Sequence, residues 1–194
     1  GKITTLARSS VIRPIVMVGL GGAVFSGMMA FQDSLTEGTR ASASTFFAVH
    51  AGTAVVSRLL LARHLSVWPR TPLIICLLGC LIAGLVCLLG MPVHPGFQIA
   101  AAVLTGAGYG LLYPVIQTWA VNLSPLEDRH AALTWFVVAY FVGIFGFPAF
   151  GGWLLVTAGK TWFIWALVAL AALELAVAVA RKPQIAGRPL PTPE

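Results

Sequence analysis

The sequence predicts an all-α, polytopic membrane protein with six transmembrane helices, and three observations support this fold class. Apolar residues make up 58% of the chain and charged residues 9%, against about 45–50% and about 25% in soluble globular domains. The apolar residues are gathered into six runs, each roughly 18–25 residues long, which is the length that crosses a hydrocarbon core of about 30 Å. Charged and turn-forming residues fall between the runs. A soluble domain of 194 residues needs a polar surface, and this chain has too few charges to form one.

The first two helices are expected over residues 14–31 and about 44–62. A basic segment, residues 1–13, precedes the first helix and is expected to be cytoplasmic, and Pro14 suits the first turn of a helix. Residues 32–43 are polar and therefore separate the two spans.

The six helices together form one transmembrane domain, residues 14–181. The dipeptide at 124–125, Ser followed by Pro, ends the fourth helix, and residues 126–130 lead into the fifth. Residues 182–194 contain four prolines and no apolar periodicity, so they are expected to be a disordered cytoplasmic tail. The remaining boundaries are a third helix at 73–90, a fourth at about 97–123, a fifth that ends near 155 and a sixth at 161–180.

The basic residues predict the orientation in the membrane. If successive helices cross in alternate directions, ten of the 12 Lys and Arg residues fall on the side that holds both termini, and only Arg40 and Lys160 fall on the other. Because loops rich in Lys and Arg stay in the cytoplasm, both termini are predicted to be cytoplasmic. The expected location is the bacterial inner membrane, in contact with the lipid bilayer.

Motifs of soluble enzymes, cofactor sites and metal sites are missing from the sequence. The glycines at 19, 21 and 22 follow no strand and precede no acid at the spacing that a dinucleotide fold requires. Cys76, Cys80 and Cys87 have no His, Asp or Glu beside them and suit helix packing. We therefore predict no cofactor, no metal and no catalytic residues. The net charge of +6 is explained by the cytoplasmic loops, and no nucleic-acid partner is expected.

Three segments in order resemble the C-terminal six-helix half of major facilitator superfamily transporters. The second helix and the loop after it read FFAVHAGTAVVSRLLLARHLSVWPR, the fourth helix contains GAGYGLLYP, and the fifth follows SPLEDRHAALTWFVVAYFVGIFGFPAFGGWLL. The resemblance covers nearly the whole chain. It implies a secondary active transporter that moves a small solute by alternating access, with proton-coupled efflux as one mode and a solute site near the membrane midplane. It also implies a partner: a first six-helix half on the same longer chain, or a second copy of this half.

The resemblance assigns a cytoplasmic gating loop to the basic residues Arg58, Arg63 and Arg70. Family members usually carry a glycine, an acid and a second glycine in this loop, whereas residues 62, 66 and 69 are Ala, Ser and Pro. The carboxylate that would lock such a gate is therefore missing, which puts the gating role in doubt.

The fourth helix carries the best candidates for solute binding. On a helical wheel, Tyr109, Tyr113 and Gln117 share a quadrant with Gly106 and Gly110. We expect the glycines to pack against a neighbouring helix and the three polar side chains to border a cavity. The opposite face is expected to meet lipid, and the first helix is expected to add a hydroxyl and a thioether to the site. These residues are Leu104, Leu111, Val115 and Trp119 on the lipid face, and Ser26 and Met29 on the first helix.

Two ionisable residues inside the spans are candidates for proton coupling, His50 and Glu174. Such groups usually face the bundle interior or a water-filled path and often relay protons. Histidine has an ordinary pKa of about 6.5 and can titrate near neutral pH. Each residue also has a structural alternative: His50 as a neutral, hydrogen-bonded side chain, and Glu174 as an acid that snorkels to the cytoplasmic interface or pairs with Arg181.

Two other function classes are weighed against transport. A non-transporting scaffold or assembly subunit would give no solute flux in vesicles. An intramembrane hydrolase of the rhomboid type needs a Ser in a Gly-x-Ser-Gly turn and a His on another helix. His50 is present, but the turn before Gly27 reads Val-Phe-Ser and lacks the first glycine. An enzymatic function is therefore not expected.

Overall fold

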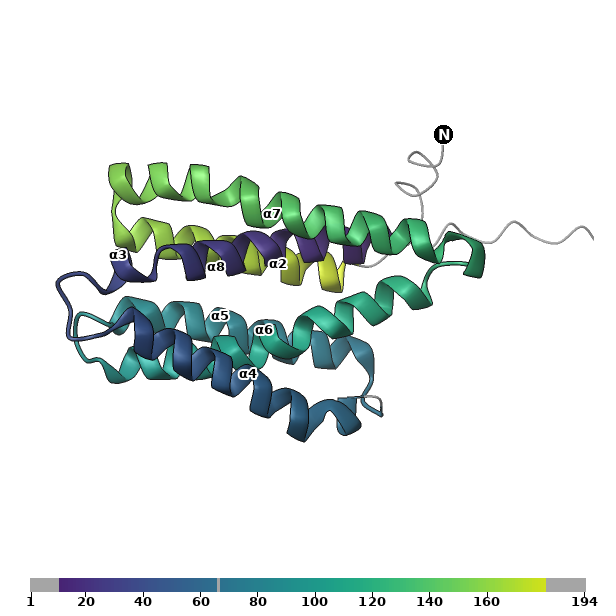
Figure 1. Ribbon diagram of the computed structural model, residues 1–194, viewed down its shortest axis with the longest axis horizontal. Coiled ribbons are helices and arrows are strands. Elements are labelled where there is room, and N and C mark those ends of the chain that lie inside the picture. Colours follow the sequence, from purple (N-terminus) through teal and green to yellow (C-terminus); the bar gives the residue numbers. More distant parts are fainter. Residues whose placement is uncertain (1–10, 66, 181–194) are drawn as a thin grey trace, which may run out of the picture.

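The computed structural model describes residues 11–65 and 67–180, and in that part of the chain it contains only helices, turns and loops (Figure 1). Six of the helices are long and apolar enough to cross a membrane. This confirms the predicted all-α fold with six spans. The helices are α2 (Ile12–Ala30), α3 (Gln32–Thr36), α4 (Ala43–Leu65), α5 (Arg70–Cys87), α6 (Gly96–Asn122), α7 (Arg129–Ala158) and α8 (Lys160–Val179), with 3-10 turns at Leu88–Gly90 and Leu126–Asp128.

The short helix α3 was not expected from the sequence. The Thr36 hydroxyl donates hydrogen bonds to the carbonyl oxygens of Gln32, at 2.9 Å, and Asp33, at 3.1 Å, and so closes this single turn. Its five residues are mostly polar and too few to show a helical period, so hydrophobic patterning gives no signal for it.

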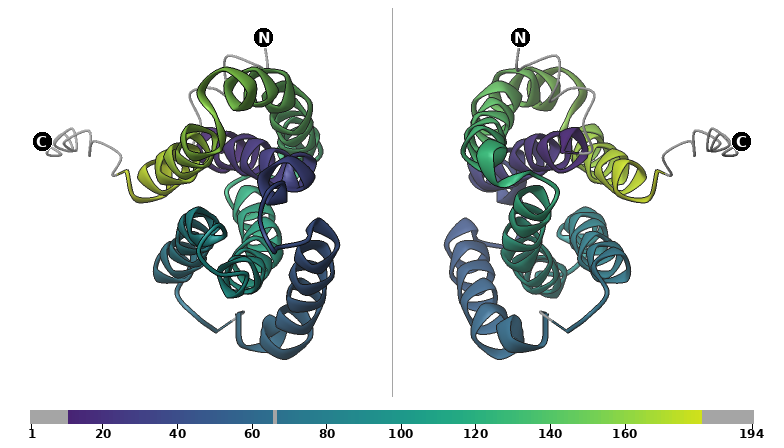
Figure 2. Two further views of the ribbon diagram at one scale, coloured as in Figure 1. Left: turned by 90° about the vertical axis from the view of Figure 1, so that its left-hand side faces the viewer. Right: turned by 90° about the vertical axis from the view of Figure 1, so that its right-hand side faces the viewer.

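The spanning helices form two groups that pack face to face (Figures 1 and 2). One group contains α7, α2 and α8, and the other contains α4, α6 and α5. Helix α6 contacts α2, α4, α5 and α7, which makes it the central helix of the bundle. Helices α4 and α5 both pack against α6 but have little contact with each other in the described part of the chain.

Glycines allow the closest approaches between helices. A Cβ atom added at Gly106 would lie 2.6 Å from the His50 carbonyl oxygen, and one at Gly110 would lie 2.9 Å from the Ala54 Cβ. The predicted packing of this glycine pair against a neighbouring helix is confirmed, and the neighbour is α4. On the other side of the bundle, a Cβ at Gly22 would lie 2.6 Å from the Tyr140 carbonyl oxygen, so α2 and α7 also meet through glycine.

The expectation that one face of α6 meets lipid is wrong for two of its residues. Leu111 is 2% exposed and Trp119 is 6% exposed. The physical reason is the central position of α6, which has protein neighbours on several sides. An apolar stripe in a spanning helix can pack against other helices as readily as against lipid tails, because both are apolar.

The start of α2 lies beside the end of α8. The Arg13 guanidinium donates to the carbonyl oxygens of Val177, at 2.9 Å from Nη2, and Ala178, also at 2.9 Å from Nη2. The last carbonyls of a helix have no partner within the helix, and a cation there is also favoured by the helix dipole. The start of the first spanning helix and the end of the last therefore lie at the same end of the bundle, as an even number of spans requires.

Candidate functional site: a cavity beside α6

A cavity of about 810 Å³ runs along α6 from near its middle to its C-terminal end. Binding pockets for small molecules measure about 300–1,000 Å³, so this cavity has a suitable size. It lies at the end of the bundle where α4 ends and α5 begins. The residues that line it are Arg58, Trp68, Arg70, Leu73, Leu111, Tyr113, Pro114, Val115, Gln117, Thr118, Trp119 and Asn122.

Pro114 sets the local geometry of this cavity. Proline has no backbone N–H, so inside a helix it leaves the carbonyl four residues earlier without its usual donor. In α6 this carbonyl belongs to Gly110, and Arg58 of α4 donates to it from Nε at 2.8 Å. The guanidinium thus replaces the missing backbone hydrogen bond and ties α4 to the proline turn. The resemblance had linked Arg58 to the gating loop, and the structure gives it this contact within α4.

The second arginine of the cavity stacks on an aromatic ring. The Arg70 guanidinium carbon lies 4.5 Å from the centroid of the Trp119 ring. Arg13 lies over the same ring at 5.6 Å. Both distances are within the range of cation–π attraction, which extends to about 6 Å. The third arginine of the predicted gating loop, Arg63, has its side chain outside the described residues.

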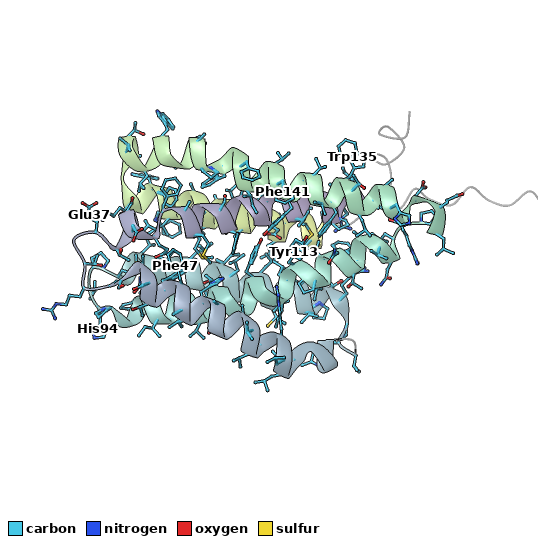
Figure 3. All side chains as sticks on the ribbon, in the orientation of Figure 1. Glu37, Phe47, His94, Tyr113, Trp135 and Phe141 are labelled. Carbon is cyan, nitrogen blue, oxygen red and sulfur yellow. The ribbon has the colours of Figure 1, made fainter. Side chains whose placement is uncertain are left out.

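All three tyrosines of the chain meet between the two groups of helices. The Tyr109 hydroxyl donates to the Tyr140 hydroxyl at 3.2 Å, and the Tyr109 ring stacks on Phe25 with centroids 4.6 Å apart. Tyr113, which is labelled in Figure 3, meets Tyr140 edge to face at 5.1 Å. Tyr140 was not predicted to take part. One signal for it was present in the sequence: Tyr140 is the third tyrosine of the chain and, like the other two, lies on a spanning helix.

The structure places only some of the five residues predicted to bind the solute at the cavity. Tyr113 and Gln117 line the cavity, and Tyr109 lies in the tyrosine cluster beside it. Ser26 is buried and donates to the Ala23 carbonyl of its own helix at 3.1 Å. Met29 is partly buried and packs against the apolar core. The cavity is therefore lined by α4, α5, α6 and Trp68 of the loop between α4 and α5, and the two predicted residues of α2 are not among its lining residues.

His50 is buried in α4 and has a hydrogen-bond partner on α6. Its Nδ1 atom lies 3.0 Å from the Thr105 hydroxyl oxygen. That hydroxyl donates to the Ala101 carbonyl at 2.7 Å, so its oxygen is the acceptor and His50 is the donor. The imidazole also stacks on Phe46, with ring centroids 5.7 Å apart. His50 thus has the hydrogen bond that its structural alternative requires, and its part in proton coupling stays a prediction.

Glu174 is fully buried in α8 at 0% exposure. Neither of its carboxylate oxygens has a hydrogen-bond partner among the described residues. It faces Gly21, where an added Cβ would lie 3.3 Å from Oε1. Complete burial does not fit a side chain that snorkels to the interface. Arg181, the predicted ion-pair partner, lies outside the described residues.

Comparisons with known proteins place the chain in a family. The sequence model of the Major Facilitator Superfamily matches residues 13–194. Three curated proteins, each described as an uncharacterized MFS-type transporter, share 32% identity with this chain over 171 residues. They come from the Pseudomonas aeruginosa strains LESB58, UCBPP-PA14 and PAO1. The matched region covers 86% of this chain and 42% of each relative, so the chain spans less than half of their length. No solved structure matches. The chain belongs to the major facilitator superfamily, a family of multi-pass membrane transporters for small molecules and not of enzymes.

Proposed function

We propose that this chain is one half of a secondary active transporter that moves a small solute by alternating access, in the direction of export. The observation that supports the proposal is the cavity along α6, which brings Tyr113 and Gln117 beside the proline turn. Solute sites of such transporters lie near the midplane, at helices interrupted by Pro or Gly. Gly110 and Pro114 lie within α6, which continues through both residues but lacks one backbone hydrogen bond at Pro114.

The partner in the proposal is a second six-helix half on the same longer chain, with a second copy of this half as the alternative. The relatives are more than twice as long as the matched region, which leaves room for six more spans. Only 11% of the residues in each of the spans formed by α4 and α7 are buried within this half. The exposed side chains include Leu59 at 77%, Val142 at 67% and Phe145 at 74%. These two helices are the surfaces that the partner half would cover.

The proposed coupling ion is a proton bound at Glu174. An ionised carboxylate without a partner is costly to bury, and no described residue donates to Glu174, so proton binding would remove an uncompensated charge. His50 is the weaker candidate because its imidazole has a hydrogen-bond partner in Thr105 and can stay neutral, so burial leaves no uncompensated charge there. Both termini of the chain are proposed to lie in the cytoplasm of a bacterial cell, in line with the distribution of Lys and Arg.

Candidate solutes are first identified as compounds whose intracellular amounts change in cells that express the full-length protein. The experiment then measures the flux of these solutes through the purified protein in proteoliposomes. Gln117→Leu removes a hydrogen-bonding group from the cavity, where an unpaired partner costs about 1–3 kcal/mol. We expect solute flux to fall by about tenfold or more. The control is Arg40→Gln, at an exposed residue, which should leave flux unchanged. Gln98→Leu would not serve because Gln98 forms hydrogen bonds with the backbone of Ser42. Normal flux in Gln117→Leu would show that the solute path was placed wrongly.

Glu174→Gln separates coupling from transport in the same assay. The amide has the shape of the carboxylic acid but cannot release a proton. We expect uphill accumulation driven by a pH gradient to be lost, while downhill exchange of solute continues. His50→Ala should retain accumulation. If accumulation persists in Glu174→Gln with its normal pH dependence, the proton does not bind at this residue.

A further inference from the structure

The cavity beside α6 is strongly positive. Arg58 and Arg70 both line it, and Arg13 lies on the ring of Trp119, which also lines it. None of the described residues that line the cavity has a carboxylate. Three cations therefore gather in and beside one cavity without an acidic residue among its described lining residues to balance them.

Within the described part of the chain, Arg58 and Arg70 use few of their hydrogen-bond donors. Arg58 uses Nε for the Gly110 carbonyl, and no described residue accepts a hydrogen bond from its two terminal nitrogens. Arg70 makes no hydrogen bond or ion pair with a described residue, and its guanidinium lies over the face of the Trp119 ring. A guanidinium presents several donors in a rigid fork that matches the oxygens of a phosphate.

The rest of the cavity suits the uncharged part of an organic ligand. Gln117 and Asn122 offer amides that can donate or accept, while Leu73, Leu111 and Val115 form an apolar wall. Arg58 of α4 and Arg70 and Leu73 of α5 line the cavity, and among the described residues these two helices have little contact with each other.

We infer that this cavity binds an organic phosphate, whose phosphate group lies between Arg58 and Arg70. The inference goes beyond the proposed function: both use the same cavity, but phosphate binding does not require the solute to pass through it. The phosphate has two possible sources. It can be a soluble phosphate ester from the cytoplasm, or it can be the headgroup of an anionic phospholipid, since basic pockets between helices on the cytoplasmic side bind such headgroups.

The test measures binding by the purified full-length protein and does not depend on flux. One arm titrates the protein with glycerol 3-phosphate and records the heat of binding. The other arm adds phosphatidylglycerol to the protein in detergent and counts bound lipids by native mass spectrometry, with phosphatidylcholine as the zwitterionic reference. Saturable binding in the first arm identifies a soluble ester, and preferential binding of phosphatidylglycerol in the second identifies a lipid headgroup.

Arg70→Gln is the decisive variant, because Arg70 is exposed at the first residue of α5 and the fold does not depend on its hydrogen bonds. We expect it to weaken phosphate binding by about ten- to a hundredfold, the range for loss of a charge-assisted hydrogen bond. Arg70→Lys keeps the charge but loses the forked donor geometry of the guanidinium, so its phosphate affinity should lie between those of the unchanged protein and Arg70→Gln. Arg40→Gln makes the same change in net charge at an exposed loop position away from the cavity and should bind normally.

The inference is wrong if neither probe binds, or if Arg70→Gln and Arg40→Gln bind equally well. Phosphate binding that depends on Arg70 supports it even if Gln117→Leu leaves solute flux unchanged. In that case the proposed solute path fails while the phosphate site stands.

Discussion

At the scale of single residues, the contact between Arg58 and the Gly110 carbonyl explains how a proline is accommodated in the central helix. From Pro114 alone, the sequence shows that the carbonyl of residue 110 needs a new donor. It does not show which residue supplies the donor, because Arg58 is 52 positions away and meets Gly110 only through the packing of α4 on α6. Resemblance to a family favoured a loop function for Arg58, and this contact is visible only in the structure.

A double-mutant cycle tests this contact. Arg58→Met should lower the free energy of unfolding by about 1–3 kcal/mol, the cost of an unpaired buried polar group. In Pro114→Ala, the new N–H of residue 114 can pair with the Gly110 carbonyl, so Arg58→Met should cost much less. Chemical unfolding in detergent measures both effects, with Arg40→Met as the control for loss of a surface charge. An equal cost in the two backgrounds would mean that Arg58 does not compensate for the proline.

At the scale of helices, the sequence predicts where each span lies but not which spans touch. The glycines of α2 were visible as a cluster, yet their partner could not be deduced, because any helix can fill a groove of small residues. In the structure this partner is α7, through contacts such as that of Gly143 with Gly19 and Ala23. The same ambiguity explains why the apolar stripe of Leu111 and Trp119 was assigned to lipid and is buried in protein.

Gly143→Ala tests the close approach of α2 and α7. A Cβ at this position would meet the Gly19 carbonyl and would lie 2.8 Å from the Ala23 nitrogen. Overpacking of this kind costs about 1–3 kcal/mol, so the thermal unfolding midpoint of the full-length protein should fall. Gly79→Ala is the matched control because an added Cβ there meets nothing within 4 Å. We expect no loss of stability in the control. Equal midpoints for the two variants would contradict the packing.

At the scale of the whole molecule, run length predicted six spans, and six helices are long enough to be spans. Charge predicted that both termini lie on one side, and the contact of Arg13 with the end of α8 places the first and last spans accordingly. The position of the cavity could be predicted only in part. Tyr113 and Gln117 were found from helical periodicity, because both face one side of α6. Arg70 and Trp119 were not assigned to a binding site, because their meeting depends on how α5 and α6 cross.

The central claim is that α6 borders a water-filled solute path through a transporter, and cysteine accessibility tests it without knowledge of the solute. Single cysteines replace Tyr113, Gln117, Leu112 and Ile116 in a full-length protein from which Cys76, Cys80 and Cys87 have been removed. The first pair lines the cavity, and the second pair is 1% exposed. Val67→Cys and Val93→Cys, at residues 81% and 83% exposed in loops on opposite sides, calibrate which side of the membrane is labelled.

Membrane vesicles of both orientations are treated with a membrane-impermeant thiol reagent, and the rate of labelling is measured at each position. We predict that cysteines at 113 and 117 react from the side that labels Val67→Cys and, more slowly, from the other side. Cysteines at 112 and 116 should not react from either side. Labelling of 112 and 116 at the rates of 113 and 117, or no reaction at 113 and 117 from either side, would contradict a solute path along α6.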